Sequence, residues 1–326
     1  MSFAHIHAED YLRHLLTSKG VELVGISDAD RHRGREVESL YGVRWFARHQ
    51  DLLSQGLDGV VVCSENARRC PLVEMAAEAG AHVLCEKPIE VTLEAAEAMQ
   101  KACLRSGVRF MTAFYMRFEP SIARVKKLVG RGELGELYAV NGINHSENPK
   151  EHRAWFAQRD LAGGGAIMDH TVHLVDLLRW YMNAEVTEVY AEVGNLFDRG
   201  EVDVDTAGLV TLTFDNGVFA SIDCSWSRPA NYPRWGHLKM ELFGERGAVS
   251  VDGFAQSLTV YDRSAPRPVS WHGWGADPTK LLIEEFIASV REERDPAITW
   301  RDGYEALRVA LACYASAEHG LPVKLV

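Results

Sequence analysis

The chain has 326 residues, 47% of them apolar, and is therefore long enough to fold as two domains with separate cores. Acidic residues outnumber basic residues by 46 to 35, and the net charge of −11 argues against nucleic acid and anionic membranes as partners. No apolar run approaches the roughly 18 residues of a membrane span, and no signal-peptide pattern is present at the amino terminus. The six cysteines lack metal-ligand or disulfide-framework spacing, which predicts reduced thiols in a cytoplasmic protein.

In the first half of the chain, short apolar segments alternate with helical patterns. The predicted strands span 21–26, 57–64, 82–85 and 108–113, and the predicted helices run to about 18 and over 31–41, 70–79 and 92–106. Strands that alternate with helices over short loops are typical of a doubly wound parallel sheet. We therefore expect an α/β domain at the amino-terminal end.

A central strand should precede the first phosphate-binding turn of such a sheet, but this sequence begins at the turn itself. Either the start lies several residues too late, or the domain lacks that strand. The late start is favoured, because loss of a central strand would remove two hydrogen-bond ladders and one apolar layer.

The turn at residues 2–7 departs from the glycine pattern of dinucleotide-binding domains. Ser2, Ala4 and His7 occupy the three positions where glycine lets backbone N–H groups and a helix N-terminus approach a pyrophosphate. Ser2 and Ala4 are small, so close approach is partly retained. The expected cofactor contacts here are Ser2, Phe3, Ala4, His5 and Ile6. The alternative is an ordinary helix start with two exposed histidines.

Asp28 follows the predicted strand 21–26, where an acidic side chain can accept hydrogen bonds from both hydroxyls of an adenosine ribose. This position favours NAD over NADP. Arg31, His32 and Arg33 lie nearby and could accommodate a 2′-phosphate, and an aspartate at a strand end is also a common turn former.

Glu86-Lys87-Pro88 directly follows the predicted strand 82–85, at the end where parallel strands open onto a crevice. Pro88 restricts Lys87 to an extended conformation, so the ammonium is directed by a stiff backbone. Taken alone, the tripeptide would favour the simpler interpretation of a surface lysine that ends a strand.

A second group of polar residues follows three glycines at 163–165. In the predicted helix 166–182, Asp169, His173 and Asp176 are spaced i, i+4 and i+7 and share one face. A carboxylate one turn from a histidine can fix its tautomer and keep it basic, as a general base requires. The alternative is a capping aspartate with a core histidine.

His170 raises the question of a metal site, with Asp169 and His173 beside it and His145 and His152 upstream. Adjacent helical residues point about 100° apart, so Asp169 and His170 are not expected to share one ion. We expect no metal.

The remaining sequence is rich in strand patterns, at 136–145, 186–193, 207–214, 218–226 and 239–243, and ends in amphipathic helices at 278–293 and 303–318. The loop 227–235 is aromatic and cationic. Its Arg228 could bind a substrate carboxylate, or the loop could form an oligomer contact.

Several motifs occur together in order, and with them the chain resembles the glucose–fructose oxidoreductase/inositol dehydrogenase family (Gfo/Idh/MocA). They are 79–88 with Glu86-Lys87-Pro88, Arg117-Phe118, Gly132-Glu133-Leu134-Gly135, the three glycines with Asp169 and His173, Gly244-Glu245-x-Gly247 and Asp302-Gly303. The resemblance implies a Rossmann domain over 1–117, followed by an α+β domain over 118–326. The second domain would carry a large open antiparallel sheet, usually the oligomer face, which favours a homodimer or homotetramer.

The resemblance also implies NAD(P)-dependent oxidation of a secondary alcohol on a sugar, polyol or inositol-like substrate. Lys87, Asp169 and His173 would be catalytic. The further cofactor contacts would be Asp28, Ser64, Asn66, Glu86, Lys87 and Arg117, and the substrate contacts Lys87, Tyr115, His145, Trp155, His170 and Arg228.

Three departures from the family pattern are the 2–7 turn, the loop Ser64–Arg69 in which only Asn66 carries over, and Tyr115-Met116 before Arg117. Two alternatives remain. One is a glycosidase or lyase that uses bound NAD transiently, and the other is a non-catalytic ligand-sensing protein whose altered turn no longer binds the cofactor.

Overall fold

The computed structural model describes residues 1–197, 200–261, 264 and 268–325. These residues form two compact units. Unit 1 contains Met1–Tyr115, Asp160–Gly163 and Thr279–Tyr304, and unit 2 contains Met116–Arg159, Gly164–Pro278 and the described residues from Glu305 onward. The first division of the chain, after Tyr115, lies close to the expected boundary at 117. Unlike the expected division, two later segments, Asp160–Gly163 and Thr279–Tyr304, also belong to unit 1. Among the described residues, no helix combines the length and apolarity needed to cross a bilayer.

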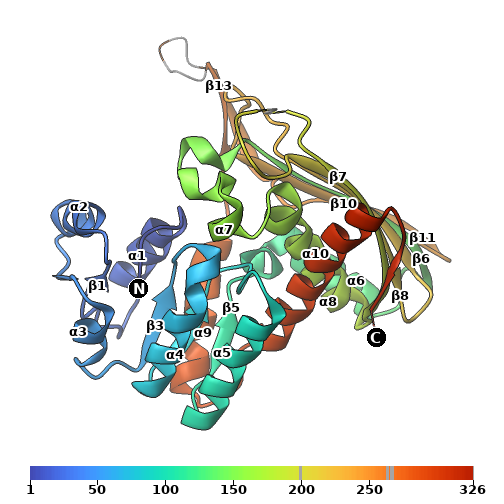
Figure 1. Cartoon of the computed structure of the whole chain (residues 1–326). Helices are drawn as coiled ribbons and strands as arrows, with labels where there is room; N and C mark the ends of the chain where they lie inside the picture. The colour runs from blue at the N-terminus through green and yellow to red at the C-terminus, as the bar shows by residue number, and fades with distance from the viewer. Residues whose placement is uncertain (198–199, 262–263, 265–267, 326) are drawn as a thin grey trace. The chain divides into compact units, whose positions relative to one another are not determined.

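Unit 1 is built from alternating helices and parallel strands (Figure 1), as the sequence predicts. Its elements before residue 115 are α1 (Ala8–Thr17), β1 (Ile26–Ser27), α2 (Arg31–Tyr41), β2 (Trp45–Phe46), α3 (His49–Leu53), β3 (Gly59–Val62), α4 (Arg69–Glu78), β4 (His82–Cys85), α5 (Leu93–Ser106) and β5 (Phe110–Thr112). Strands β3, β4 and β5 pair in parallel, and α4 packs on β3 and β4. The doubly wound α/β architecture is confirmed.

The parallel strands of unit 1 fall into two sheets, β1-β2 and β3-β4-β5. The first two residues contact both sheets, because the Met1 ammonium donates to Val61 O at 2.6 Å, Cys63 N donates to Met1 O at 3.0 Å, and Ser2 N donates to Ser27 O at 2.7 Å. Behind Met1, a cavity of about 390 Å³ separates the sheets; its apolar lining includes Leu12, Leu15, Val60 and Phe286. Of the residues predicted as a strand at 21–26, only Ile26 lies in a strand, as the first residue of β1.

Local sequence signals explain where the helices of unit 1 begin and end. Thr92 caps α5, because its hydroxyl accepts from Ala95 N at 3.2 Å, and Gly107 ends the helix at φ +67°. Asp30 caps α2 by accepting from His32 N and Arg33 N. Helix α2 therefore begins at Arg31, three residues after Asp28.

Unit 2 contains a seven-stranded sheet in the order β11-β10-β6-β9-β8-β7-β14 (Figure 1). Its strands are β6 (Leu137–Ser146), β7 (Val186–Gly194), β8 (Ala207–Phe214), β9 (Phe219–Ser225), β10 (Gly236–Gly244), β11 (Gly247–Asp252) and β14 (Val323–Lys324). Only β6 and β9 pair in parallel. Strands β12 (Ser257–Tyr261) and β13 (Val269–Gly273) form a separate antiparallel pair. The large, mostly antiparallel sheet is confirmed.

One face of the large sheet is covered by the helical segments η5 (Ile167–Thr171), a π-helix, and α8 (Val172–Met182). The approach is close at Gly208, where a Cβ would lie 2.5 Å from the Ile167 side chain. Alternate residues on the other face are exposed, including Leu209, Phe219 and Phe243. The remaining helices of the described chain are α6 (Pro120–Gly130), α7 (Arg159–Ala162), α9 (Pro278–Arg291) and α10 (Trp300–His319). Most of α7 and α9 belongs to unit 1. The short 3-10 turns are η1 (Asn66–Arg68), also in unit 1, and η2 (Tyr115–Phe118), η3 (Pro149–Glu151) and η4 (Ala154–Ala157).

Candidate active site

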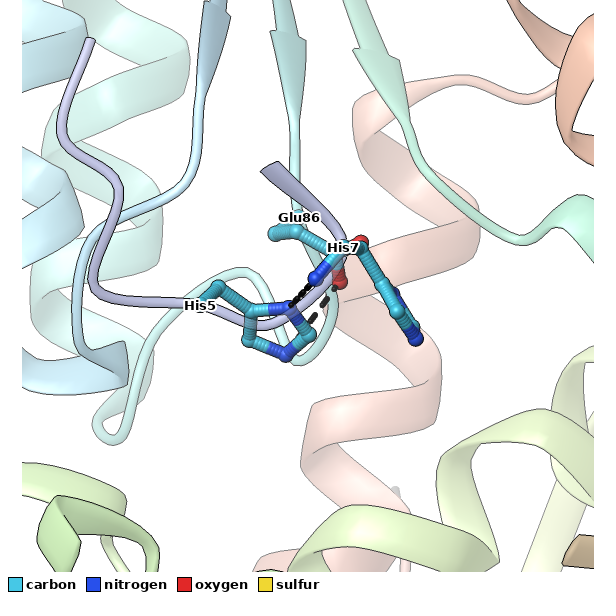
Figure 2. Close-up of side chains that lie close together, drawn as sticks. All are labelled: His5, His7 and Glu86. Carbon is cyan, nitrogen blue, oxygen red and sulfur yellow. Dashed lines mark hydrogen bonds and ion pairs between the residues drawn. The ribbon is translucent and has the colours of Figure 1, made fainter. Parts of the chain in front are cut away.

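In unit 1, the turn at residues 2–7 is fixed to the end of β4 by side chains (Figure 2). His7 Nδ1 lies 2.8 Å from Glu86 Oε1, His5 Nε2 lies 3.8 Å from Glu86 Oε2, and the Tyr11 hydroxyl also donates to Oε1. The turn that lacks the usual glycines is thus held by its two histidines. Neither histidine is an exposed side chain of an ordinary helix start, since His5 is buried and His7 is half-buried.

Burial and charge set the protonation of this cluster. Burial lowers the pKa of His5 well below its ordinary value, which favours the neutral ring. Burial acts to raise the pKa of Glu86, but His5, His7 and Lys87 outweigh it and hold that pKa well below its usual range. Burial and the Glu86 charge raise the pKa of Tyr11, so its hydroxyl remains a donor.

His5, His7 and Glu86 are also the one group of three potential metal ligands found in the described part of the chain, with ligand atoms within 4.8 Å of one another. The Glu86 carboxylate is already engaged on both oxygens, because Oε2 accepts from Lys87 N at 2.8 Å while Oε1 accepts from Tyr11. The cationic Lys87 side chain next to this carboxylate also disfavours a metal ion. The cluster is therefore explained as an anchor for the turn.

Lys87 is 4% exposed, so it is not the surface lysine of the simpler interpretation. The following segment is held by the fully buried Arg69, which donates to Pro88 O and, at 3.3 Å, to Ser64 O. The Lys87–Pro88 peptide bond is cis. The backbone that carries the Lys87 ammonium is thus fixed on both sides.

Asp28 lies at the end of β1, as the sequence predicts, and is 1% exposed. Its carboxylate accepts from Phe3 N at 2.7 Å, which joins it to the 2–7 turn. It also forms a two-pronged ion pair with Arg33, with Nε–Oδ2 at 2.7 Å and Nη2–Oδ1 at 2.9 Å. The turn, Asp28 and Lys87 thus all lie at the same end of the parallel strands, where doubly wound folds bind their ligands.

The other predicted contacts of unit 1 lie near these groups. Ser64 and Asn66 are buried after β3; the Asn66 amide donates to Ala162 O at 2.8 Å, while its buried Oδ1 has no hydrogen-bond partner among the described residues. The Tyr115 ring lies 6.0 Å from the ring of His7, edge to face. Ala4 is fully buried, and Ile6 is half-buried.

In unit 2, Gly164 and Gly165 are needed because the segment just before η5 packs against Asp205 and Tyr314. A Cβ on Gly165 would lie 1.8 Å from Asp205 O, and one on Gly164 would lie 2.0 Å from the Tyr314 hydroxyl. The Asp205 carboxylate accepts from Gly165 N and Ile167 N, both at 2.8 Å, and from the Tyr314 hydroxyl at 2.8 Å. Asp205 therefore caps the helical segment that carries Asp169.

The predicted helix 166–182 begins as the π-helix η5, and Asp169 and His170 both lie in it. His170 Nε2 lies 3.3 Å from Asp169 Oδ2, so these adjacent side chains do approach each other, unlike the expectation for a regular α-helix. Trp226 Nε1 donates to Asp169 Oδ2 at 3.4 Å. His173 follows in the first turn of α8 and is buried.

Asp176, the third residue of the predicted helix face, forms a buried ion pair with Arg117. The guanidinium binds the carboxylate twice, with Nε–Oδ2 at 2.9 Å and Nη2–Oδ1 at 2.6 Å. Arg117 also lies over the Trp180 ring, 5.4 Å from its centroid. In this structure Arg117, a predicted cofactor contact, fixes α8 to the segment before α6.

Within unit 2, His145 and Arg228 lie on the other side of the sheet from Asp169 and His170. Strand alternation turns Ser146 toward His170, with Ser146 Oγ 3.1 Å from His170 Nε2, and turns His145 toward the opposite face. There Arg228 Nη2 lies 3.1 Å from His145 Nδ1 and 3.4 Å from His237 Nδ1. Trp155 is buried and stacks on Phe156 at 3.9 Å. His170, one of the predicted substrate contacts in unit 2, adjoins Asp169.

The sequence indicated Arg33 only as a group that could accommodate a 2′-phosphate, and its ion pair with Asp28 was not predicted. An arginine in the first turn of a helix can turn back to a carboxylate before it, so this spacing carried a signal. Five further residues that hold the candidate residues in place were missed: Tyr11, Arg69, Asp205, Trp226 and Tyr314. Most of their partners are distant in the sequence, so no local pattern indicated these contacts.

Comparisons with known proteins agree with this geometry. Residues 3–114 match a family described as "Oxidoreductase family, NAD-binding Rossmann fold", and residues 122–250 match "GFO/IDH/MocA C-terminal domain". Myo-inositol 2-dehydrogenase of Thermotoga maritima is 29% identical, covering 98% of this chain and 95% of that protein. The scyllo-inositol 2-dehydrogenase (NAD(+)) of Bacillus subtilis is 26% identical, covering 97% and 92%.

Two solved structures are similar over nearly the whole chain. A probable dehydrogenase from Thermotoga maritima has a TM-score of 0.81 at 27% identity, covering 96% of this chain and 94% of that one. GenD2 from gentamicin A biosynthesis, in complex with NAD, has a TM-score of 0.88 at 23% identity, covering 97% and 92%. At that identity the second similarity is one of fold.

Proposed function

We propose that this chain, which belongs to the Gfo/Idh/MocA family of oxidoreductases, oxidises a secondary alcohol of a sugar, polyol or inositol-like substrate with NAD. The observation that carries the proposal is the buried Lys87 at the end of β4, joined through Glu86 to the turn at residues 2–7. A buried lysine that is held at the ligand-binding end of a parallel sheet can direct its ammonium group at a bound substrate, whereas a surface lysine is solvated and free to move.

The residues of unit 1 fit a dinucleotide. Asp28 lies where ribose hydroxyls are bound, and the N-terminus of α1 follows the turn directly, which suits a pyrophosphate. The lowered His5 pKa leaves a neutral ring beside Glu86, so the turn itself carries little fixed charge. Bound NAD supplies the acceptor for the hydride that leaves the substrate carbon.

Within this proposal, Lys87 donates a hydrogen bond to the reacting hydroxyl oxygen and stabilises the negative charge that develops there. His173 accepts the hydroxyl proton as general base, and Asp169 positions the histidine. The capping of η5 by Asp205 and Tyr314 would keep Asp169 in place. We propose Ser2, Phe3, Ala4, His5, Ile6, Ser64 and Asn66 as further cofactor contacts, and Tyr115 and His170 as substrate contacts.

The class of substrate is inferred from the relatives. Two relatives that cover nearly the whole chain are named as inositol dehydrogenases, and another, 25% identical, is named D-apiose dehydrogenase of Paraburkholderia graminis. All three substrates are polyhydroxy compounds with secondary alcohols. The polar groups predicted around Lys87 and His173 are suited to such a compound.

A ligand-sensing protein remains the second candidate, because histidine replaces glycine at the end of the 2–7 turn. The His7 side chain is held by Glu86, so it is turned to the end of β4. If this arrangement excludes the pyrophosphate of NAD, the chain would have the fold of the family but would not catalyse the oxidation.

We also propose a homodimer or homotetramer that buries the open face of the large sheet in unit 2, where Leu209, Phe219 and Phe243 are 58%, 55% and 38% exposed. A cytoplasmic location is supported by the six cysteines, all of which are free in the structure. Size-exclusion chromatography with light scattering would test the assembly.

The direct test of cofactor use is thermal unfolding with and without excess NAD, NADH and NADP. Ligand at 100 times its Kd stabilises the folded protein by about 2.7 kcal/mol. A shift with NAD or NADH supports the oxidoreductase. No shift with any nucleotide would favour the sensor.

A further inference from the structure

Trp226 is a buried tryptophan in unit 2 whose indole N–H is directed at Asp169. Its Nε1 donates to Asp169 Oδ2 at 3.4 Å, and the residue is 3% exposed. An indole carries a single N–H and no acceptor, so this nitrogen can form no other strong hydrogen bond. A core position that needed only an aromatic ring would accept phenylalanine, so packing alone does not explain the donor.

The indole ring is held by a small apolar cluster. Trp226 packs in this cluster with Ala166, Val202 and Val204, all of which are buried. Ala166 directly precedes η5, so the cluster joins the indole to the helical segment that carries Asp169. The direction of the N–H is therefore set by the packing of unit 2.

The carboxylate of Asp169 needs such a donor, because its side chain is only 14% exposed. His170 is less suited to that task. Its Nε2 lies 3.3 Å from Asp169 Oδ2 but also 3.1 Å from Ser146 Oγ. The Ser146 hydroxyl donates its own hydrogen to Glu147 O at 2.7 Å, so its oxygen is an acceptor for the His170 N–H. Asp169 thus shares the His170 N–H with Ser146, whereas the Trp226 N–H has no second acceptor.

We propose that Trp226 is a positioning residue for the oxidation: its indole N–H holds Asp169 Oδ2, so that Oδ1 remains available to orient His173. The inference rests on the proposed function and adds this residue to it. A donor to a carboxylate favours the ionised form, which is the form that can keep a histidine basic. The bond is long at 3.4 Å, and hydrogen bonds of this kind commonly shorten when the substrate is bound.

The first test compares the pH dependence of kcat and the KM for NAD in the wild type and Trp226→Phe, with a secondary-alcohol substrate. Trp226→Phe keeps an aromatic ring in the cluster but removes the donor. Its kcat at neutral pH should fall about tenfold, with an unchanged KM for NAD. The acidic limb of its kcat profile should move to higher pH by about 0.5–1 unit, because a carboxylate that has lost a donor is protonated more readily.

Trp300→Phe is the matched control, because Trp300 Nε1 also donates to a protein oxygen, Ala96 O at 2.8 Å, within unit 1. This variant should lower the unfolding temperature and leave the kcat profile where it is. An unshifted profile in Trp226→Phe, as in the control, would show that the indole only fills the core and would overturn the proposal.

Replacement of Asp169 separates positioning from packing. In an Asp169→Asn background, Trp226→Phe should change kcat by less than about twofold, because the group through which it acts is already altered. A tenfold loss in that background as well would overturn the proposal.

A second readout needs no Trp226 variant and no turnover. Asp169→Asn removes the anionic acceptor, so one of the eight tryptophan indole N–H resonances should move upfield in protein labelled with 15N-tryptophan. If none of them moved, the proposal would be wrong. A shifted resonance without NADH formation from any substrate would instead contradict the proposed function, and the positioning role with it.

Discussion

Replacement of Asp205 by alanine tests how unit 2 fixes the start of η5, the helical segment that carries Asp169. The carboxylate is 6% exposed and accepts from the backbone N–H groups of Gly165 and Ile167 and from the Tyr314 hydroxyl, each at 2.8 Å. Burial and the Asp205 charge raise the pKa of Tyr314 well above its ordinary value, so its hydroxyl stays protonated and donates. Asp205→Ala would remove the acceptor of Ile167 N and of the Tyr314 hydroxyl, and would leave Gly165 N with only its longer bond, 3.1 Å, to the Tyr314 hydroxyl oxygen.

The size of the effect follows from those three bonds. A buried donor that loses its partner costs about 1–3 kcal/mol, and the cavity around alanine admits some water, so we expect a loss of about 3 kcal/mol or more in the free energy of unfolding. Asp205→Asn keeps one acceptor oxygen and should lose about half as much. Because Asp169 lies in the capped segment, turnover should also fall.

Urea unfolding of Asp205→Ala, Asp205→Asn and Asp203→Ala would measure these losses. Asp203 is an exposed carboxylate in the same segment, and its replacement should change stability by less than about 0.5 kcal/mol. If Asp205→Ala lost no more stability than the Asp203 control, the capping role would be wrong.

Other predictions address the remaining parts of the structure. Lys87→Met and His173→Ala should each lower kcat by at least about a hundredfold with little change in unfolding temperature, and near-normal turnover in either would contradict the assigned role. Burial lowers the pKa of His49 to about 4, below its value of about 6.5 in the unfolded chain. The unfolded chain therefore binds a proton that the folded chain does not, and stability should fall as the pH falls from about 6.5 to about 4. His49→Gln should flatten that part of the pH–stability curve, and an unchanged slope would refute this. An apolar extension of about five residues fused ahead of Met1 should fill the cavity between β1 and β3 and so raise the unfolding temperature. A Gly/Ser extension of equal length should not raise it. Equal effects of the two extensions would show that the two sheets do not accept a strand there.

Local pattern was sufficient for most of the elements. The strand at 82–85 occurs at the predicted residues, because it is a short apolar run. The helix at 31–41 also occurs as predicted, because its sequence has a 3.6-residue period and an aspartate at the capping position. Helix α6 was missed although Glu119 caps it and Pro120 occupies its first position, a pair of signals that the sequence did carry.

Motif or strand-end signals indicated Lys87, Asp28 and Asp169 as candidate site residues, and their roles stay predictions. Most of the groups that hold these residues and their neighbours in place come from distant parts of the chain and were not predicted. Tyr11 reaches Glu86 across 75 residues, and Tyr314 reaches Asp205 across 109. No local pattern specifies such contacts, because they depend on how the elements pack.

The helical segment that carries Asp169 and His170 also differs from the prediction. A regular α-helix directs adjacent side chains about 100° apart, whereas in the π-helix η5 His170 Nε2 lies 3.3 Å from Asp169 Oδ2. Gly165 packs closely against Asp205 just before this segment, and the glycine run alone does not reveal that contact.

The central claim is that this chain transfers hydride from a polyhydroxy alcohol to NAD with the help of Lys87. The most direct measurement is NADH formation, followed by absorbance, when the wild type and Lys87→Met are mixed with NAD and a panel of inositols, aldoses and polyols. The account predicts NADH with at least one secondary-alcohol substrate for the wild type, and a loss of at least about a hundredfold for Lys87→Met with nucleotide binding retained. Nucleotide binding without NADH from any substrate, or undiminished NADH formation by Lys87→Met, would contradict it.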